Sequence, residues 1–174
     1  MIVTSLNVST GGIPKKSISS CCITKIGLSG DGHNHPKHGG EIQAVSLLDE
    51  EILDSLKEEG LFLQPGALGE NITLRKAAIQ NSAIGDEILF SGGVILEITK
   101  VRTPCYTLDT ISTNLKKILW NRIGMYARVI TTGVIKRGEG FVRNNKGLGQ
   151  RPALRDIPKG CVDGSSSWPP FFYE

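Results

Sequence analysis

One cysteine of this chain lies where a thiol could take part in chemistry, at the end of a predicted β-strand. Residues 94–102 are rich in apolar side chains, and the chain continues as Arg102-Thr103-Pro104-Cys105. Because proline interrupts strand pairing, we expect Cys105 on a loop at the rim of a sheet. A nearby Arg102 guanidinium would favour the thiolate, which is the nucleophilic and metal-binding form of cysteine. The alternative is that Cys105 is a small buried apolar residue, as most free cysteines are.

Length and charge fit a single folded domain that handles a small molecule. The 174 residues carry a net charge of +3, and no dense run of lysine and arginine occurs. This balance argues against a nucleic-acid partner and suits an anionic small molecule better. The first residues lack a charged leader, and no stretch reaches a membrane-spanning length. We therefore expect a cytoplasmic protein that makes no membrane contact.

Short β-prone runs separated by glycine predict a mostly β fold that looks like a barrel. The 21 glycine residues are spread along the whole chain. A hairpin is predicted to turn at Ser91-Gly92-Gly93, between strands over 87–90 and 94–102. The remaining predicted strands cover 2–8, 20–26, 41–45, 71–74, 127–132 and 141–143.

Two amphipathic segments predict helices among these strands. In the first, Ser46 is the expected cap, apolar side chains recur at helical spacing, and Gly60 is the expected stop. The second covers about 113–123 and ends at Gly124. From residue 147 onward the sequence is rich in Gly, Pro and Ser and has neither helical nor strand periodicity, which predicts an irregular tail.

Glycine-anchored motifs follow one another in a fixed order along the first 140 residues. They are Gly11-Gly12-Ile13-Pro14-Lys15, Gly30-Asp31-Gly32-His33, His38-Gly39-Gly40, Gly66-Ala67-Leu68-Gly69-Glu70-Asn71-Ile72-Thr73, Ile84-Gly85-Asp86, Arg102-Thr103-Pro104-Cys105 and Gly124-Met125-Tyr126-Ala127-Arg128. In this order they resemble the MOSC family, which occurs at the C-terminus of molybdenum cofactor sulfurases and as small stand-alone bacterial proteins. The resemblance does not extend to the tail.

This resemblance implies a fold and a domain boundary. The fold would be a closed, strongly coiled β-barrel of mixed but mainly antiparallel strands with a few short helices, and with a cofactor cleft at its rim. The barrel domain would cover 1–146, and 147–174 would be the irregular Gly/Pro/Ser-rich tail.

The resemblance also implies a set of site residues. Cys105 would either carry sulfur as a persulfide or ligate molybdenum, with Arg102 beside it. The residues that would contact the molybdopterin cofactor are Lys15, His38, Gly69, Asn71, Thr73 and Arg128. Other interpretations stay open, since Lys15 could be a solvated surface charge, Asn71 a turn residue and Arg102 a sheet-surface charge.

Three functions are compatible with these residues. The first is binding of the molybdenum cofactor or carriage of sulfur in cofactor maturation or delivery. Sulfur would then come from a separate cysteine desulfurase, which would hold the pyridoxal phosphate that this chain lacks. A molybdoenzyme would be the client of such a protein. The second function is a small molybdenum-dependent reductase of N-hydroxylated compounds that receives electrons from a redox partner. The third is a non-catalytic structural or regulatory barrel. The sequence leaves open whether the protein is an enzyme.

Overall fold

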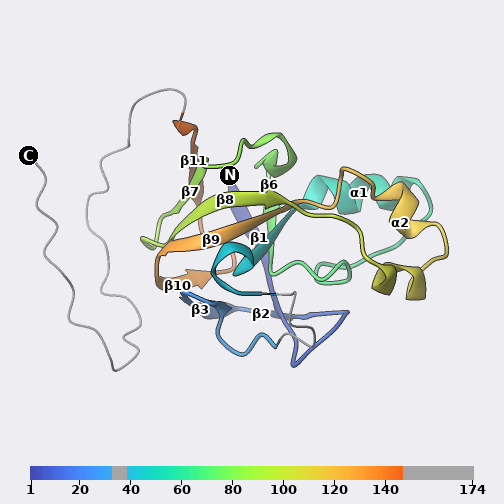
Figure 1. Cartoon of the computed structure of the whole chain (residues 1–174), viewed down its shortest axis with the longest axis horizontal. Coiled ribbons are helices and arrows are strands. Elements are labelled where there is room, and N and C mark those ends of the chain that lie inside the picture. The colour runs from blue at the N-terminus through green and yellow to red at the C-terminus, as the bar shows by residue number, and fades with distance from the viewer. Residues whose placement is uncertain (33–38, 147–174) are drawn as a thin grey trace, which may run out of the picture.

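The described part of the chain is mostly β, as predicted, and forms two sheets with a few short helices (Figure 1). The computed structural model describes residues 1–32 and 39–146. His38 and the predicted tail 147–174 therefore lie outside the described residues.

The larger sheet has eight strands in the order β11-β7-β8-β9-β5-β6-β1-β2. Its strands are β1 (Ile2–Val8), β2 (Lys16–Ile18), β5 (Val45–Asp49), β6 (Ile72–Arg75), β7 (Glu87–Phe90), β8 (Ile95–Val101), β9 (Met125–Thr131) and β11 (Phe141–Asn144). β5 and β6 run parallel, whereas the other neighbouring strands of this sheet are antiparallel. The predicted hairpin at 91–93 is confirmed, because β7 and β8 pair and Gly93 donates to the Phe90 carbonyl at 2.9 Å.

The expectation of a closed barrel is wrong. In the described part of the chain, β2 and β11 are the two ends of the large sheet, and no ladder joins them. The strand that follows β9 leaves this sheet, since β10 (Gly133–Lys136) pairs with β3 (Ser20–Thr24). With β4 (Gly27–Leu28), they make a separate three-stranded sheet in the order β10-β3-β4. The chain thus uses a second sheet, not closure of the first, to cover its apolar side chains.

The segment that was predicted as strand 41–45 followed by a helix from Ser46 folds differently. Glu41–Gln43 is a 3₁₀ helix (η1), and Ser46 lies inside β5. All five residues of β5 are buried, because the strand pairs with β9 on one side and with β6 on the other. An apolar run that is buried on both faces carries no alternation, so its sequence looks helical as readily as extended.

Three helices form a layer at one end of the molecule, away from β7 and β11 (Figure 1). They are α1 (Glu50–Glu58), η3 (Tyr106–Thr110) and α2 (Leu115–Ile118). The short 3₁₀ helix η2 (Ile79–Asn81) lies apart from them, next to β11, whose Arg143 donates to the Ala78 carbonyl at 2.7 Å. Gly60 does follow the end of α1, with φ 89°, as predicted. The second predicted helix is much shorter than expected, and the chain turns at Asn121, whose φ is 63°.

Two apolar clusters hold these layers together. The larger one lies between the strands and includes Leu6, Ile23 and Phe90. The smaller one joins the helices to the sheet and includes Leu48, Leu56, Leu115 and Leu119. No helix in residues 1–32 and 39–146 has the length and apolar character needed to cross a bilayer.

The smaller cluster is predicted to carry a measurable share of the stability. Leu56→Ala removes a fully buried side chain from it and should lower the free energy of unfolding by about 2–5 kcal/mol. Ile42→Ala is the control, because Ile42 is 63% exposed. Urea unfolding measures the free energy of unfolding of both variants. Equal losses in Leu56→Ala and Ile42→Ala would contradict the packing described.

Candidate functional site

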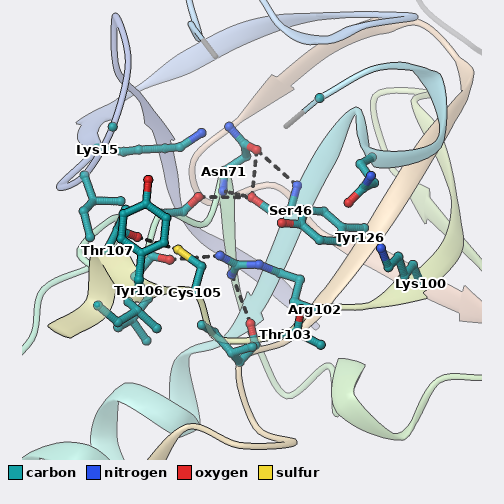
Figure 2. Close-up of a pocket in the computed structure, with 18 of the residues that line it drawn as sticks. Lys15, Ser46, Asn71, Lys100, Arg102, Thr103, Cys105, Tyr106, Thr107 and Tyr126 are labelled. Atoms are coloured by element: carbon teal, nitrogen blue, oxygen red, sulfur yellow. Dashed lines mark hydrogen bonds between the residues drawn. The ribbon is translucent and has the colours of Figure 1, made fainter. Parts of the chain in front are cut away.

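A cavity of about 460 Å³ opens where the large sheet meets the loops and the helical layer (Figure 2). Its wall includes the basic side chains of Lys15, Lys100 and Arg102 together with the thiol of Cys105. No acidic side chain is among the described residues that line it. The cavity therefore combines positive charge with one soft nucleophile.

Cys105 lies outside the sheet, as predicted from Pro104. β8 ends at Val101, and Cys105 directly precedes η3 as its N-cap residue. The thiol is half-buried, and its Sγ lies 2.6 Å from the Thr107 hydroxyl oxygen. Cys105 is thus a reachable thiol on a short, defined turn and not a core residue.

Arg102 is a buried wall residue, so its interpretation as a sheet-surface charge is wrong. It is only 8% exposed. Its Nη1 donates to the Ile123 carbonyl at 3.0 Å and its Nη2 to the Leu68 carbonyl at 2.9 Å. The guanidinium also lies 5.6 Å from the centre of the Tyr126 ring, within cation–π range. Its two terminal nitrogens are thus held by carbonyl groups, and its charge stays beside the cavity.

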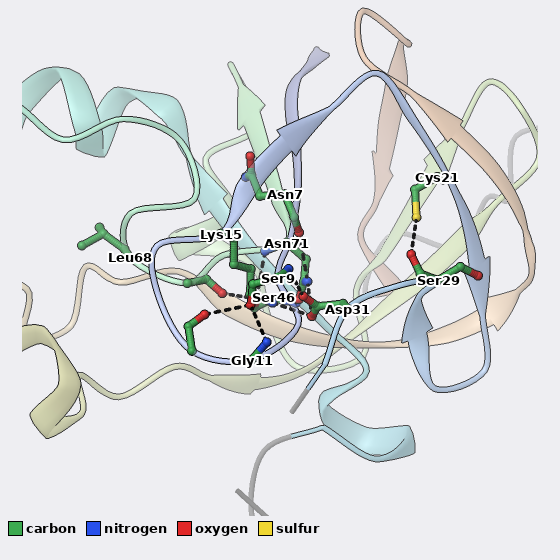
Figure 3. Close-up of polar contacts among 12 residues, drawn as sticks. Asn7, Ser9, Gly11, Lys15, Cys21, Ser29, Asp31, Ser46, Leu68 and Asn71 are labelled. Atoms are coloured by element: carbon green, nitrogen blue, oxygen red, sulfur yellow. Dashed lines mark hydrogen bonds and ion pairs between the residues drawn. The ribbon is translucent and has the colours of Figure 1, made fainter. Parts of the chain in front are cut away.

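Lys15 is held by a buried carboxylate, which overturns its interpretation as a solvated surface charge. Its Nζ pairs with Asp31 Oδ2 at 2.5 Å, and the two side chains are only 10% and 2% exposed. Burial lowers the pKa of Lys15, and the hydrogen bond and charge of Asp31 counteract this effect in part. The same carboxylate accepts from the Ser9 amide at 2.9 Å (Figure 3).

The Asn71 side chain joins three segments of the chain. Its Nδ2 donates to Asp31 Oδ2 at 2.8 Å and to the Asn7 carbonyl at 3.3 Å. Its Oδ1 accepts from the amide and the hydroxyl of Ser46, at 3.1 and 2.8 Å. Asn71 therefore does not act within a local turn. It connects β1, β5 and the Asp31 loop next to the cavity.

Two glycines of the 66–71 loop need their lack of a side chain. A Cβ on Gly66 would lie 2.4 Å from the Lys15 carbonyl oxygen, and φ is 88°. At Gly69 φ is 79°, and a Cβ would lie 3.0 Å from a methyl group of Ile13. The close approach lets Lys15 donate its backbone N–H to the Gly66 carbonyl at 2.9 Å. Gly69 itself lines the cavity.

Glu70 is a fully buried carboxyl group behind this loop. Its Oε1 accepts from the Gly66 amide at 2.6 Å and from the Thr73 hydroxyl at 3.2 Å. Its Oε2 is bonded by no group in the described part of the chain. Burial raises the pKa of Glu70, and the Gly66 amide and the Arg102 charge lower it by less.

Two predicted site residues, Thr73 and Arg128, lie apart from the cavity wall. Thr73 is fully buried in β6, where it bonds Glu70 and accepts from Asn7 Nδ2 at 3.2 Å. Arg128 lies two residues beyond Tyr126 on β9 and pairs with Glu97 at 2.9 Å. His38 lies outside the described residues. In the described ranges no cluster of three His, Cys, Asp or Glu side chains is placed to hold a metal ion.

Several wall residues were not predicted from the sequence. Thr107 and Tyr106 belong to the turn that follows Cys105, and their nearness to the thiol along the chain is the signal that could have found them. Asp31, which does not line the cavity but holds two residues that do, gives no such signal, because Lys15 and Asn71 reach it from distant positions in the sequence.

Comparison with family models matches most of the chain to one family. The family model for the MOSC domain matches residues 34–142. The chain is 31% identical over 121 residues to a protein named reductase from Gibberella moniliformis (strain M3125 / FGSC 7600). That match covers 65% of this chain and 22% of the relative, so the chain spans about a fifth of the relative's length.

Solved structures show the same fold at low sequence identity. YiiM from Geobacillus stearothermophilus has a TM-score of 0.70 at 23% identity, over 90% of this chain and 79% of that one. The YuaD protein from Bacillus subtilis has a TM-score of 0.69 at 16% identity, over 83% and 97%. YiiM from Escherichia coli has a TM-score of 0.63 at 21% identity, over 82% and 70%.

The buried Glu70 should make stability depend on pH. Folding raises the pKa of Glu70. Below the pKa of an unfolded glutamate, about 4.3, Glu70 therefore makes its full favourable contribution to the free energy of unfolding. This contribution is lost as the pH rises through the folded-state pKa. Glu70→Gln removes this titration. Above about pH 4.3, the free energy of unfolding of the variant should therefore rise relative to that of the wild type. Each unit by which folding raises the pKa of Glu70 corresponds to a difference of about 1.4 kcal/mol.

Thermal and urea unfolding between pH 4 and 8 measure this difference. The matched control is Glu58→Gln, which changes an exposed residue of α1. If the Glu70→Gln and wild-type stabilities run parallel across this pH range, Glu70 does not hold its proton more tightly in the folded state.

Proposed function

Since the chain belongs to the MOSC domain family, we propose that its cavity binds the molybdenum cofactor and that Cys105 carries sulfur or ligates molybdenum there. The observation that carries the proposal is the make-up of the cavity wall. Lys15, Lys100 and Arg102 contribute positive charge, and the described wall residues include no acidic side chain. A cavity of this charge favours an anionic ligand such as a pterin phosphate.

The residues present fit this cofactor in size and in chemistry. A volume of about 460 Å³ falls within the range of pockets that hold small organic ligands, roughly 300–1,000 Å³. Lys15 and Lys100 would hold the anionic part, while the Cys105 thiolate is a suitable soft ligand for molybdenum. When bound, the cofactor would supply redox and atom-transfer chemistry at its metal.

As a sulfur carrier, Cys105 would act by thiol exchange with a persulfide on a separate cysteine desulfurase. The Cys105 thiolate attacks the outer sulfur of that persulfide, a new sulfur–sulfur bond forms, and the donor cysteine leaves as a thiolate. The outer sulfur keeps its proton and changes carrier without net oxidation or reduction. The half-buried position of Cys105 at the cavity wall suits this role, because a donor can reach the thiol.

A second candidate function is reduction of N-hydroxylated compounds, and the relative named reductase favours it. Two electrons and two protons would convert an N–OH group into N–H and water. A separate redox partner would supply the electrons. Turnover with a reduced donor protein distinguishes this enzyme from a carrier, and the complete absence of bound pterin would favour a non-catalytic domain.

Cys105→Ser tests the central residue. Serine preserves size but removes the soft sulfur, so sulfur loading and bound molybdenum should both fall to background while the fold is retained. Mass spectrometry after incubation with a cysteine desulfurase and cysteine measures the first quantity, and metal analysis of protein from a molybdopterin-producing host measures the second. Cys21→Ser is the control, because Cys21 is buried in β3. Full loading of Cys105→Ser in both assays would refute the proposal.

Lys15 should contribute to cofactor retention through its charge. Lys15→Met removes a cation from the wall and should weaken binding about tenfold or more. The measurement is pterin content during washing at increasing salt, and Lys116→Ala on the exposed face of α2 is the control. If all variants retain the same amount of pterin, the anionic part of the cofactor does not bind at Lys15.

A further inference from the structure

We propose that Thr107 is the positioning residue for the Cys105 thiol, because its hydroxyl contacts the sulfur directly and fixes it at the cavity wall. This inference rests on the proposed role of Cys105. Thr107 itself lines the cavity, two residues beyond the thiol (Figure 2). Neither the family match nor the relatives described above assign it a role.

The geometry of the turn supports this assignment. Cys105 Sγ and Thr107 Oγ1 are 2.6 Å apart. The Cys105 carbonyl accepts from the Leu108 amide at 3.2 Å, and the Thr107 carbonyl accepts from the Thr110 hydroxyl at 2.6 Å. The backbones that carry the sulfur and the hydroxyl are therefore both held by the same 3₁₀ turn. Threonine is also branched at Cβ, which restricts its χ1 angle.

The two groups suit each other as hydrogen-bonding partners. A protonated Cys105 can donate to Thr107 Oγ1, and the Thr107 hydroxyl can in turn donate to the sulfur. Arg102 is a poorer candidate for this contact, because its terminal nitrogens donate to the Leu68 and Ile123 carbonyls. The hydroxyl thus holds the sulfur in place through a direct contact.

The test measures the reactivity of the Cys105 thiol without any cofactor. The full chain is treated with iodoacetamide at pH 7, and peptide mass spectrometry follows the alkylation of Cys105 alone. Thr107→Val keeps the shape of the side chain and removes the hydroxyl. It should slow alkylation about tenfold, because the sulfur loses the contact that fixes its orientation. Thr107→Ser retains the hydroxyl and should stay within about twofold of the wild type.

Thr113→Val is the matched control, because it removes a hydroxyl from an exposed residue beyond the turn. It should leave the alkylation rate unchanged, and thermal unfolding confirms that each variant is folded. If Thr107→Val is destabilised, Thr107→Ala repeats the test with a smaller side chain. A wild-type rate for the variants without the hydroxyl, or an equal loss in Thr113→Val, overturns the inference. Neither result depends on cofactor or sulfur loading. The sulfur and molybdenum assays of Cys105→Ser therefore test the proposed function independently of this inference.

Discussion

The hydrogen bonds of the Asn71 amide group are the constraint on which the cavity depends. They connect the carbonyl of Asn7 at the end region of β1, Ser46 in β5 and the carboxylate of Asp31. These segments are far apart in the sequence, and β5 and β6 also form the parallel pair of the sheet. A side chain with donors and an acceptor can satisfy all three at once, which an apolar residue cannot. The cavity wall is therefore assembled by polar contacts on top of an apolar core.

Buried charge beside the cavity follows from this assembly. Taking Lys15, Asp31, Glu70 and Arg102 out of water is costly, and each is compensated by hydrogen bonds from neighbouring backbone or side chains. The acidic members face the basic ones or the loop amides, whereas Lys15 and Arg102 also border the open space. Positive charge is thus presented to a ligand in a partly dry environment, where electrostatic attraction is stronger than at the surface.

The sequence predicted strands well where periodicity and turn residues agreed, and the 2–8 and 87–90 strands have the expected bounds. It failed at 41–49, because a strand buried on both faces lacks an alternating pattern, and it failed on closure, because sheet partners are chosen by long-range packing. Within the site, the loop position of Cys105 follows from local rules about proline. The Lys15–Asp31 pair could not be predicted, since it depends on how two loops meet in space.

The thiol and its neighbours come from one short segment, whereas the cationic wall combines Lys100 and Arg102, which directly precede this segment, with the distant Lys15. Cys105, Tyr106 and Thr107 are consecutive and belong to no strand, so replacing them leaves the ladders of both sheets intact. Lys15 and Arg102, in contrast, are tied to loops that the sheets position. Reactivity and charge preference are consequently separable traits. Exchange of a single turn can replace the reactive group of this scaffold while the basic side chains of the cavity wall stay in place.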